Sequence, residues 1–457
     1  MKRKHLGIAL AAAILAASLP GAVFAQQAAI PHRVEAFSLD SGRHHGSAPG
    51  PKATARPAFR ETVEAADAPW LRLHFGRTRL GPGSFLVLTS RKDGAQQILN
   101  ARSLKEWNHT SAFFNGDKVD VELWVGPGQK GNFAKVRELM VGEPGRPMKT
   151  ICGTSDNRTT SHDPAVGRIV PVGCTGWVIA NGAHLSAGHC VDPGFQTLQF
   201  NVPPSLADGT IQHPPPQDQY PIITGSVQFS YSPFTNSIGN DWALFSVQRN
   251  SNTGRLPVEV YSGFLRLSRD TVPSFVRVTG YGLDGPAPNF GTPPAPRNSD
   301  SQTQQWHSGS YLGLSTSGGS SIPHHRYTVD TQGGNSGSPI IAQILTVDNL
   351  GIGLGIHTNG GCTSSGGSNR GTSFANVALR NAINAYAGAA PVYVDQNHLA
   401  AAEDGTMFRP YDTVTEGTAA VVPGGVVSIV RGNYDVPALT LDRPMKLTAP
   451  VGMVTIH

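Results

Sequence analysis

The sequence predicts an all-β protein of two or three domains, and its length, composition and patterning each contribute to that prediction. The chain has 457 residues, which exceeds the size of an ordinary single domain. Glycine (53) and proline (35) are abundant while charged residues make up only 15%, a mixture typical of loop-rich β proteins. Several segments alternate apolar and polar residues with a period of two, as half-buried strands do.

The first 25 residues have the composition of a secretory signal peptide. Residues 2–4 are basic, residues 6–19 are apolar, and residues 23–25 supply the small side chains of a cleavage site after Ala25. The apolar run is short for a membrane span and is followed by Pro20-Gly21. We therefore expect residues 1–25 to be removed, and the rest of the chain to be secreted without a membrane partner.

Charge and cysteine content exclude several classes of function. Three of the net +5 charges belong to the expected signal peptide, which leaves +2 for the remaining chain. No basic run is interleaved with aromatic residues, so we expect no nucleic-acid partner. The four cysteines of an exported chain predict two disulfides, and the lack of a Cys-x-x-Cys pair argues against a zinc or redox site. We expect neither a metal nor another cofactor.

The N-terminal third predicts a spacer followed by a small β-sandwich. Residues 26–66 are rich in Ala, Pro, His and Arg without periodicity, which indicates a flexible spacer or part of a pro-segment. Residues 67–142 predict a sandwich with a pro-domain or accessory role, because they alternate regularly and carry no cluster of catalytic residue types. Residues 141–149 form a basic linker suited to proteolytic processing. The clearest strands of the predicted sandwich are residues 71–75, 85–88 and 119–125.

His189 is the first candidate catalytic residue. The segment from Cys174 to Cys190 predicts a strand, a turn at Asn181-Gly182, a second strand and a turn of small residues that holds His189. A lone histidine in a secreted protein is usually an ordinary surface or packed residue. Here the neighbouring Cys190 can fix the imidazole in place, as a general base requires.

An acid and a serine follow in the chain. Asp241 stands at the entrance of an apolar strand, where it either caps the strand or orients a histidine. Ser336 lies in Gly333-Gly334-Asn335-Ser336-Gly337, which is either a plain Gly/Ser loop or the tight turn of a nucleophile. Glycines suit the second role because they let backbone N–H groups approach a developing oxyanion.

The order His189, Asp241, Ser336 resembles that of chymotrypsin-like serine endopeptidases. Within that group, residues 150–388 resemble most closely the bacterial glutamyl endopeptidases, and Ser155-Asp-Asn-Arg158 resembles the start of their mature chains. The stretches that carry the resemblance are Cys174-Thr-Gly-Trp to His189-Cys190, Gln305-Trp-His-Ser-Gly, Tyr327 to Pro339, Gly355-Ile-His-Thr-Asn-Gly and Asn369-Arg-Gly-Thr372.

The resemblance implies a double β-barrel that hydrolyses proteins or peptides. It makes Ser336 the nucleophile, His189 the general base and Asp241 the residue that orients His189. It places the oxyanion hole at the N–H groups of Gly334 and Ser336, so that replacing Gly334 should reduce turnover more than stability. It also implies the disulfides Cys174–Cys190 and Cys152–Cys362.

Two specificities remain open at this stage. Asp330 lies six residues before Ser336, where trypsin-like enzymes keep the acid that attracts Lys or Arg. Thr331 and His357 resemble instead the hydroxyl and imidazole with which glutamyl endopeptidases contact a substrate carboxylate. We favour cleavage after Glu, and after Asp as a further option, over cleavage after Lys or Arg. A non-catalytic secreted binding protein on a protease scaffold is the rival class.

Activation of the trypsinogen type is not expected. Arg168-Ile169 looks like a zymogen cleavage point, but Ile169 lies too close to Cys174 for a freed amine to reach across a barrel. Asn335 also stands where the acid that pairs with such an amine would be needed. We expect processing near Lys149 instead.

Residues 390–457 predict a third, short unit. The runs Tyr393-Val-Asp, Pro423-Gly-Gly and Gly432-Asn-Tyr resemble the first coils of a pectin-lyase-type parallel β-helix. The segment is too short for a complete solenoid. We expect a binding, anchoring or capping module with a surface or a polysaccharide as its partner, and no lyase residues are implied. Strands are expected within 426–430, 438–441, 445–447 and 454–456.

Overall fold

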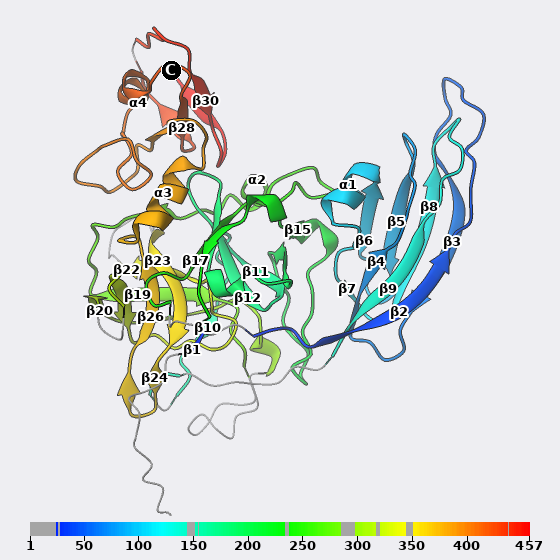
Figure 1. Ribbon diagram of the computed structural model, residues 1–457, viewed down its shortest axis with the longest axis horizontal. Coiled ribbons are helices and arrows are strands. Elements are labelled where there is room, and N and C mark those ends of the chain that lie inside the picture. The colour runs from blue at the N-terminus through cyan, green and yellow to red at the C-terminus, as the bar shows by residue number, and fades with distance from the viewer. Residues whose placement is uncertain are drawn as a thin grey trace, which may run out of the picture.

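The computed structural model is all-β, with about 10% helix, a closed six-stranded barrel and a half-barrel. It describes residues 24–25 (backbone only), 28–143, 151–153, 155–233, 237–284, 298–316, 320–343, 351–436 and 438–457. In Figure 1 a sandwich (cyan to blue) stands to one side of the barrels, and the C-terminal unit (orange to red) stands above their other end. The expected all-β class, with a sandwich before a chymotrypsin-like double barrel, is confirmed.

The sandwich consists of two four-stranded sheets around one apolar core. Leu71, Leu73, Leu86, Leu88 and Val121 are among the side chains that fill the space between the sheets. Helix α1 (Ala101–Glu106) closes one end and begins with a capping box between Asn100 and Ser103. The sheets are, in order, β2 (His32–Asp40), β9 (Lys135–Gly142), β4 (Trp70–Phe75) and β7 (Phe114–Asn115), and β3 (Arg56–Glu64), β8 (Lys118–Val125), β5 (Phe85–Ser90) and β6 (Gln96–Asn100).

The expected flexible spacer at residues 26–66 is wrong for much of its length. Residues 32–40 form β2, which pairs with β9, and residues 56–64 form β3, which pairs with β8. Both are edge strands whose side chains are mostly exposed or half-buried. An edge strand with little buried surface carries no clear alternation in its sequence, so the pattern that revealed β4 and β8 is missing here.

The half-barrel carries the histidine and the aspartate of the candidate site. Its central strands β11, β12 and β13 are almost entirely buried, as expected for strands that line a barrel core. The order of its sheet is β15 (Gln219–Pro221), β14 (Phe195–Gln199), β11 (Val166–Pro171), β12 (Cys174–Val178), β13 (His184–Ser186), β17 (Trp242–Phe245) and β16 (Gln228–Ser230).

The closed barrel carries the serine. Its sheet becomes a ring because β23 pairs with both β22 and β26. The ring runs β23 (Ile352–Gly360), β22 (Pro339–Gln343), β19 (Phe275–Gly280), β20 (Gln305–Ser315), β21 (His324–Tyr327) and β26 (Asn369–Ser373). Outside the ring, β1 (Phe24–Ala25), β10 (Thr159–Thr160) and β18 (Arg266–Leu267) add to its strands, and β24 (Cys362–Thr363) pairs with β25 (Gly366–Gly367).

The C-terminal unit is built from parallel strands. Val392 of the first strand pairs with Val427 of the second, which pairs in turn with Leu447 of the third, so successive passes of the chain stack in register. The expected strand at residues 438–441 is not formed among the described residues of that stretch. The strands are β27 (Val392–Val394), β28 (Val426–Ile429), β30 (Lys446–Thr448), β29 (Gly432–Tyr434) and β31 (Val454–Ile456), with helix α4 (Val414–Ala420) between β27 and β28.

Two further helices lie on the barrel domain. Helix α2 (Pro257–Tyr261) follows β17, and α3 (Val377–Ala385) follows β26, where the spacing of Leu379 and Ile383 predicts a closing helix. Both residues are buried in the core that also receives Tyr393 and Phe408 of the C-terminal unit. Part of the C-terminal unit therefore packs into the barrel core, beside a separate core of its own.

Candidate active site

The serine turn lies between β21 and β22, and its glycines are required by its shape. Gly334 and Gly337 have φ angles of +100° and +89°, which L side chains rarely adopt. A Cβ on Gly334 would lie 2.2 Å from the carbonyl oxygen of Tyr281, and one on Gly337 would lie 2.1 Å from that of Thr175. A side chain at Gly334 would thus distort the turn itself, so its replacement should cost stability as well as turnover, and which effect is larger stays a prediction.

The histidine turn is packed just as closely. His189 lies in the single turn Gly188–Cys190, directly after β13. A Cβ on Gly188 would lie 2.1 Å from the carbonyl oxygen of Ser230, so only glycine fits before the histidine. The disulfide Cys174–Cys190 ties this turn to β12. The position of His189 is therefore fixed by the close packing of Gly188 before it and by the disulfide of Cys190 after it.

The structure brings His189, Asp241 and Ser336 together. The His189 Nδ1 atom lies 2.6 Å from Asp241 Oδ2, and its Nε2 atom lies 2.7 Å from Ser336 Oγ. The other carboxylate oxygen of Asp241 accepts the backbone N–H of His189 at 3.0 Å. All three side chains are buried. The aspartate thus holds both the ring and the backbone of the histidine, and the ring faces the hydroxyl.

The backbone around the serine is oriented by hydrogen bonds to neighbouring strands. The N–H of Leu283 donates to Gly333 O at 2.7 Å. Because a trans peptide points its C=O and N–H in opposite directions, this bond directs the N–H of Gly334 away from Leu283. The Thr175 hydroxyl donates to Gly334 O at 2.9 Å. Among the hydrogen bonds of the described residues, neither Gly334 N–H nor Ser336 N–H has an internal acceptor.

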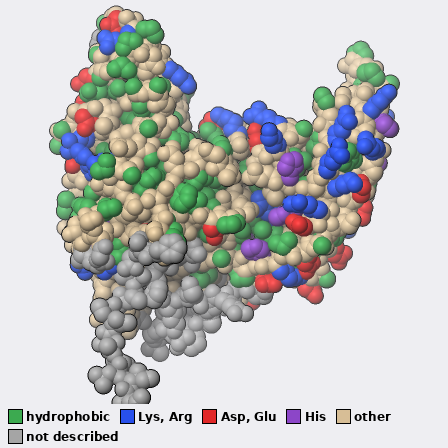
Figure 2. Space-filling view, viewed as in Figure 1, with side chains coloured by type: hydrophobic (Ala, Val, Ile, Leu, Met, Phe, Trp, Pro, Cys, Tyr) green, Lys and Arg blue, Asp and Glu red, His purple; other side chains and the backbone are tan. Residues whose placement is uncertain are grey.

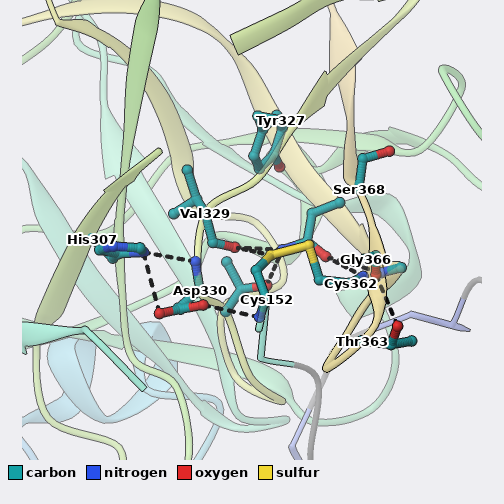
Figure 3. Close-up of a disulfide and its surroundings, with 12 residues drawn as sticks. Cys152, His307, Tyr327, Val329, Asp330, Cys362, Thr363, Gly366 and Ser368 are labelled. Carbon is teal, nitrogen blue, oxygen red and sulfur yellow. Dashed lines mark hydrogen bonds and ion pairs between the residues drawn. A yellow bond between two sulfur atoms is a disulfide. The ribbon is translucent and has the colours of Figure 1, made fainter. Parts of the chain in front are cut away.

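Asp330 is engaged by the first residues of the barrel domain. Its carboxylate accepts the N–H groups of Cys152 and Asn157, each at 2.9 Å, and the Asn157 amide at 3.0 Å. The Asp330 N–H donates to His307 Nδ1 at 2.8 Å, so that ring nitrogen is an unprotonated acceptor. Figure 3 shows Asp330 between His307 and the Cys152–Cys362 disulfide. The Asp330 carboxylate is fully buried, and these hydrogen bonds hold the first residues of the barrel domain against the serine turn.

His357 lies in β23 behind the serine turn. Its backbone C=O accepts Gly337 N–H and its backbone N–H donates to Ser338 O, each at 2.8 Å. Burial, with a smaller effect of His189, lowers the pKa of His357 to about 3, so its ring is neutral near pH 7. The Tyr327 hydroxyl is hydrogen-bonded to His357 Nδ1, and burial raises the pKa of that hydroxyl well above its ordinary value.

Asn369 is a supporting residue to which sequence analysis assigned no role. Its amide donates to Thr331 Oγ1 at 2.8 Å and to Val329 O at 2.6 Å. Its Oδ1 accepts Gly361 N–H and Cys362 N–H at 2.9 and 3.1 Å. It thereby joins the candidate substrate-binding residue Thr331 to the turn that carries the second disulfide. The spacing of residues around Asn369 does not predict these contacts, because its partners lie in distant segments.

Thr372 supports the aspartate in a similar way. Its hydroxyl donates to the carbonyl of Asp241 at 2.7 Å and accepts the N–H of the same residue at 3.2 Å. Both Asn369 and Thr372 belong to the short run 369–372, whose resemblance to glutamyl endopeptidases was the only signal for either.

The Arg168–Ile169 bond is inaccessible. It lies within β11, which pairs with β12 on one side and β14 on the other. The Arg168 guanidinium is fully buried and donates to Gln199 Oε1, Gln302 O and Gln212 O. A protease cannot reach this bond in the folded protein, which agrees with the expectation that activation does not occur there.

The disulfides are Cys174–Cys190 and Cys152–Cys362, the pairs that the resemblance implies. Among the described residues, two groups of side chains have the types and spacing that could bind a metal ion. One of them consists of His189 and the two cysteines of the Cys174–Cys190 disulfide. The other is an exposed acidic trio, Glu403, Asp412 and Glu416.

Within the described part of the chain, no helix is long and apolar enough to cross a membrane.

Comparison with known proteins places the barrels in a class. Residues 174–346, which include all three side chains of the candidate site, match the family of trypsin-like peptidase domains. The chain thus contains a trypsin-like peptidase domain with the chymotrypsin fold. None of the curated protein sequences matches the chain.

Solved structures with similarity to this chain include two microbial proteases and a human protein. The thermostable serine protease AL20 from an extremophilic microorganism is 13% identical, with 46% of this chain and 92% of that chain covered and a TM-score of 0.33. Protease Anisep from Arthrobacter nicotinovorans is 14% identical, with coverages of 48% and 93% and a TM-score of 0.33. Human heparin binding protein is 16% identical, with coverages of 48% and 92% and a TM-score of 0.31.

Proposed function

We propose that the protein is a secreted serine endopeptidase that uses His189, Asp241 and Ser336 as its catalytic triad. The observation that carries the proposal is the continuous hydrogen-bonded line from Asp241 Oδ2 through His189 to Ser336 Oγ, at 2.6 and 2.7 Å. A nucleophile within hydrogen-bond reach of a base that a third group orients is the arrangement needed for acyl transfer.

The steps follow from this arrangement. Ser336 Oγ attacks the carbonyl carbon of the scissile peptide while His189 Nε2 takes the hydroxyl proton. The N–H groups of Gly334 and Ser336 stabilise the negative oxygen of the tetrahedral intermediate. The imidazolium, stabilised by Asp241, gives its proton to the leaving amine, and water then repeats the sequence on the acyl-enzyme. Each step uses groups of the protein and water alone.

We propose a preference for Glu, and secondarily Asp, before the scissile bond. The buried carboxylate of Asp330 is already hydrogen-bonded to Cys152 and Asn157, so it is a poor partner for an incoming Lys or Arg. His357, in β23 next to the serine turn, and the Thr331 hydroxyl offer groups that hydrogen-bond a carboxylate. A neutral imidazole can act as a donor of this kind without bringing an unpaired charge into the barrel.

The other parts of the chain have proposed roles around this domain. We assign residues 150–388 to the peptidase, the sandwich before it to a pro-domain or accessory domain, and residues 390–457 to a binding or anchoring module. Export by a signal peptide at residues 1–25 remains a proposal, since most of that segment lies outside the described residues. The same holds for processing near Lys149, which lies among the undescribed residues 144–150.

Hydrolysis of a peptide panel by the wild type and Ser336→Ala tests the proposal. Peptides with Glu, Asp, Lys, Arg or Phe before the scissile bond should rank with Glu first, and Ser336→Ala should lose about 10⁶-fold in kcat. A fluorophosphonate should label the wild type and not the variant. An unlabelled wild type would make the protein a binding scaffold, and preferential turnover of Lys or Arg peptides would overturn the Glu preference alone.

A further inference from the structure

The N-terminal end of the described chain lies against the peptidase barrel. The backbone of β1 pairs antiparallel with the end of β23, with Phe24 opposite Gly360 and Ala25 opposite Asn359. These two partners follow His357 closely in β23. A strand edge of this kind is a binding site for an extended peptide, because its N–H and C=O groups recognise any backbone.

A second set of contacts lies on the half-barrel. The N–H of Ala28 donates to Gly173 O, and the N–H of Ile30 donates to Pro171 O, both at 2.9 Å. The side-chain amide of Gln302 donates to Ala28 O, also at 2.9 Å. A Cβ on Gly173 would lie 1.6 Å from Ala28 O, so the two backbones meet as closely as a glycine allows.

The two sets of contacts flank the serine. On one side, His357 of β23 accepts the N–H of Gly337, the residue after Ser336, at 2.8 Å. On the other side, Thr175, two residues after Gly173, donates its N–H to Ser336 O at 2.8 Å. Phe24–Ala25, which pair with Asn359–Gly360, and Ala28, which pairs with Gly173, therefore contact the walls on both sides of Ser336.

This segment is anchored to the sandwich as well. Ile30 is buried in a cluster that joins the sandwich to the half-barrel, and the carbonyl of Pro31 accepts the N–H of Glu143 at 3.0 Å. The sandwich docks through further contacts, including the pair Arg72 Nη1 and Gln196 Oε1 at 2.5 Å. The other members of the apolar cluster are Trp70, Phe113, Met140, Val170 and Ile211.

We propose that Phe24–Ala25 and Ala28–Pro31, here called the N-terminal strap, hold the peptidase in an autoinhibited state by occupying its peptide-binding groove as a substrate would. This inference rests on the proposed peptidase function. Removal of residues 1–25 would release the β23 edge, while Ala28 and Ile30 would keep the Gly173 side occupied. Full activity then requires the strap to leave together with the sandwich that anchors it.

The test uses the full chain with Ala28→Pro and Ile30→Pro, which remove both N–H donors of the strap. Ala29→Ser is the matched control, because this side chain is exposed and its N–H makes no hydrogen bond among the described residues. Hydrolysis of an internally quenched peptide that spans both sides of the scissile bond reports on the groove. Fluorophosphonate labelling reports on Ser336 independently of a long substrate.

The double variant should raise kcat/KM for the quenched peptide about tenfold over the wild type, with the control unchanged. Gln302→Ala, which removes one contact to the strap, should give a smaller increase and serves if the double variant does not fold. Labelled Ser336 with unchanged peptide hydrolysis in the folded double variant and in Gln302→Ala would overturn the inference and leave the peptidase proposal intact. Absence of labelling in every form would instead remove the peptidase proposal, and the inference with it.

Discussion

Asp241 uses both carboxylate oxygens on one residue. Oδ2 receives the ring of His189, and Oδ1 receives its backbone N–H. This double contact fixes the position of the turn as well as the tautomer of the imidazole, since a carboxylate accepts from Nδ1 and leaves Nε2 to face Ser336.

Asp241→Asn should therefore reduce kcat by about 10⁴-fold, because an amide that donates to Nδ1 places the ring proton on Nε2, where it cannot accept from the serine. KM for a Glu peptide should change little. Steady-state kinetics at neutral pH measures both, with Ser336→Ala as the reference for complete loss. A drop in kcat of less than tenfold would show that His189 does not depend on this aspartate.

Three buried histidines make the barrels sensitive to acid. Burial lowers the pKa of His184 and of His325 to about 4, and that of His357 to about 3. Each therefore stays neutral in the folded protein while the unfolded chain takes up a proton near pH 6.5. Above about pH 6.5 the three rings are neutral in both the folded and the unfolded chain, and they cost no stability. As the pH falls from there toward 4, only the unfolded chain takes up these protons, so the free energy of unfolding falls.

His184→Leu should reduce this acid sensitivity. His184 packs against Phe245 in the half-barrel core, so leucine keeps an apolar contact there without a titrating group. Between pH 7.5 and 5.5 the free energy of unfolding should fall by about 1 kcal/mol less in the variant than in the wild type. Denaturant titrations at both pH values measure the difference, and equal losses would show that folding does not lower the pKa of His184.

The sequence predicts His189, Asp241 and Ser336 as candidate site residues because each lies in a local motif of small or apolar neighbours. The sequence does not predict the contacts of Asp330. Whether that carboxylate faces a substrate or the chain depends on Cys152 and Asn157, which lie far away in sequence. A motif states which chemistry a residue can perform, whereas long-range pairing decides what the residue contacts.

At the scale of elements, the Cys152–Cys362 disulfide joins the start of the peptidase domain to β24, which follows β23. It links residues 210 positions apart, whereas Cys174–Cys190 spans 16. Cross-linking a longer loop restricts the unfolded chain more. The backbone N–H of Cys152 donates to Asp330, and that of Cys362 donates to Asn369, so the disulfide lies between these two residues.

Replacing Cys152 and Cys362 together by Ala should lower the free energy of unfolding by about 3–5 kcal/mol, and by more than the same change at Cys174 and Cys190. KM for Glu peptides should rise in the first variant, because the wall behind Thr331 loses a tether. Guanidinium denaturation and kinetics on both double variants provide the comparison. Equal stabilities would show that the longer loop is already restricted in the unfolded chain.

Edge and interior strands also differed in how well the sequence predicted them. Strand β8 alternates clearly because one of its faces is buried, whereas β2 is mostly exposed and carried no signal. In the C-terminal unit, strands β28, β30 and β31 were predicted, but 438–441 was mistaken for a strand. Short apolar runs favour a strand in isolation, and only pairing with a neighbour decides whether one forms.

At the scale of the molecule, the three parts are joined by polar contacts as well as by apolar cores. The buried ion pair of Arg266 and Asp395, with contacts of 2.6 and 3.0 Å, ties the C-terminal unit to β18. On the face seen in Figure 2, Lys and Arg side chains gather over the sandwich, and uncharged side chains cover most of the barrels. On this face the sandwich and the barrels thus present different surfaces.

Arg266→Ala should destabilise the protein by about 3–5 kcal/mol, because it leaves the Asp395 carboxylate buried without its partner. Combining Arg266→Met with Asp395→Asn should recover most of that loss, since no charge then remains buried. Thermal unfolding of both variants beside the wild type measures the effect. A double variant as unstable as Arg266→Ala would show that the contribution lies in shape and not in charge pairing.

Strand β23 belongs to the closed barrel, carries His357 of the candidate substrate site and pairs with the N-terminal strap. These combined roles limit which mutations can change the substrate preference of the protein. Every one of its residues from Ile352 to Gly360 is buried, and it pairs with β1, β18, β22 and β26. A mutation that alters the candidate carboxylate site at His357 therefore also alters the barrel, and most such mutants would be lost before a new preference could be selected. During evolution in the laboratory or in nature, new substrate preferences should arise first in exposed loops such as the one that carries Tyr231, whose ring lies 5.7 Å from that of His189.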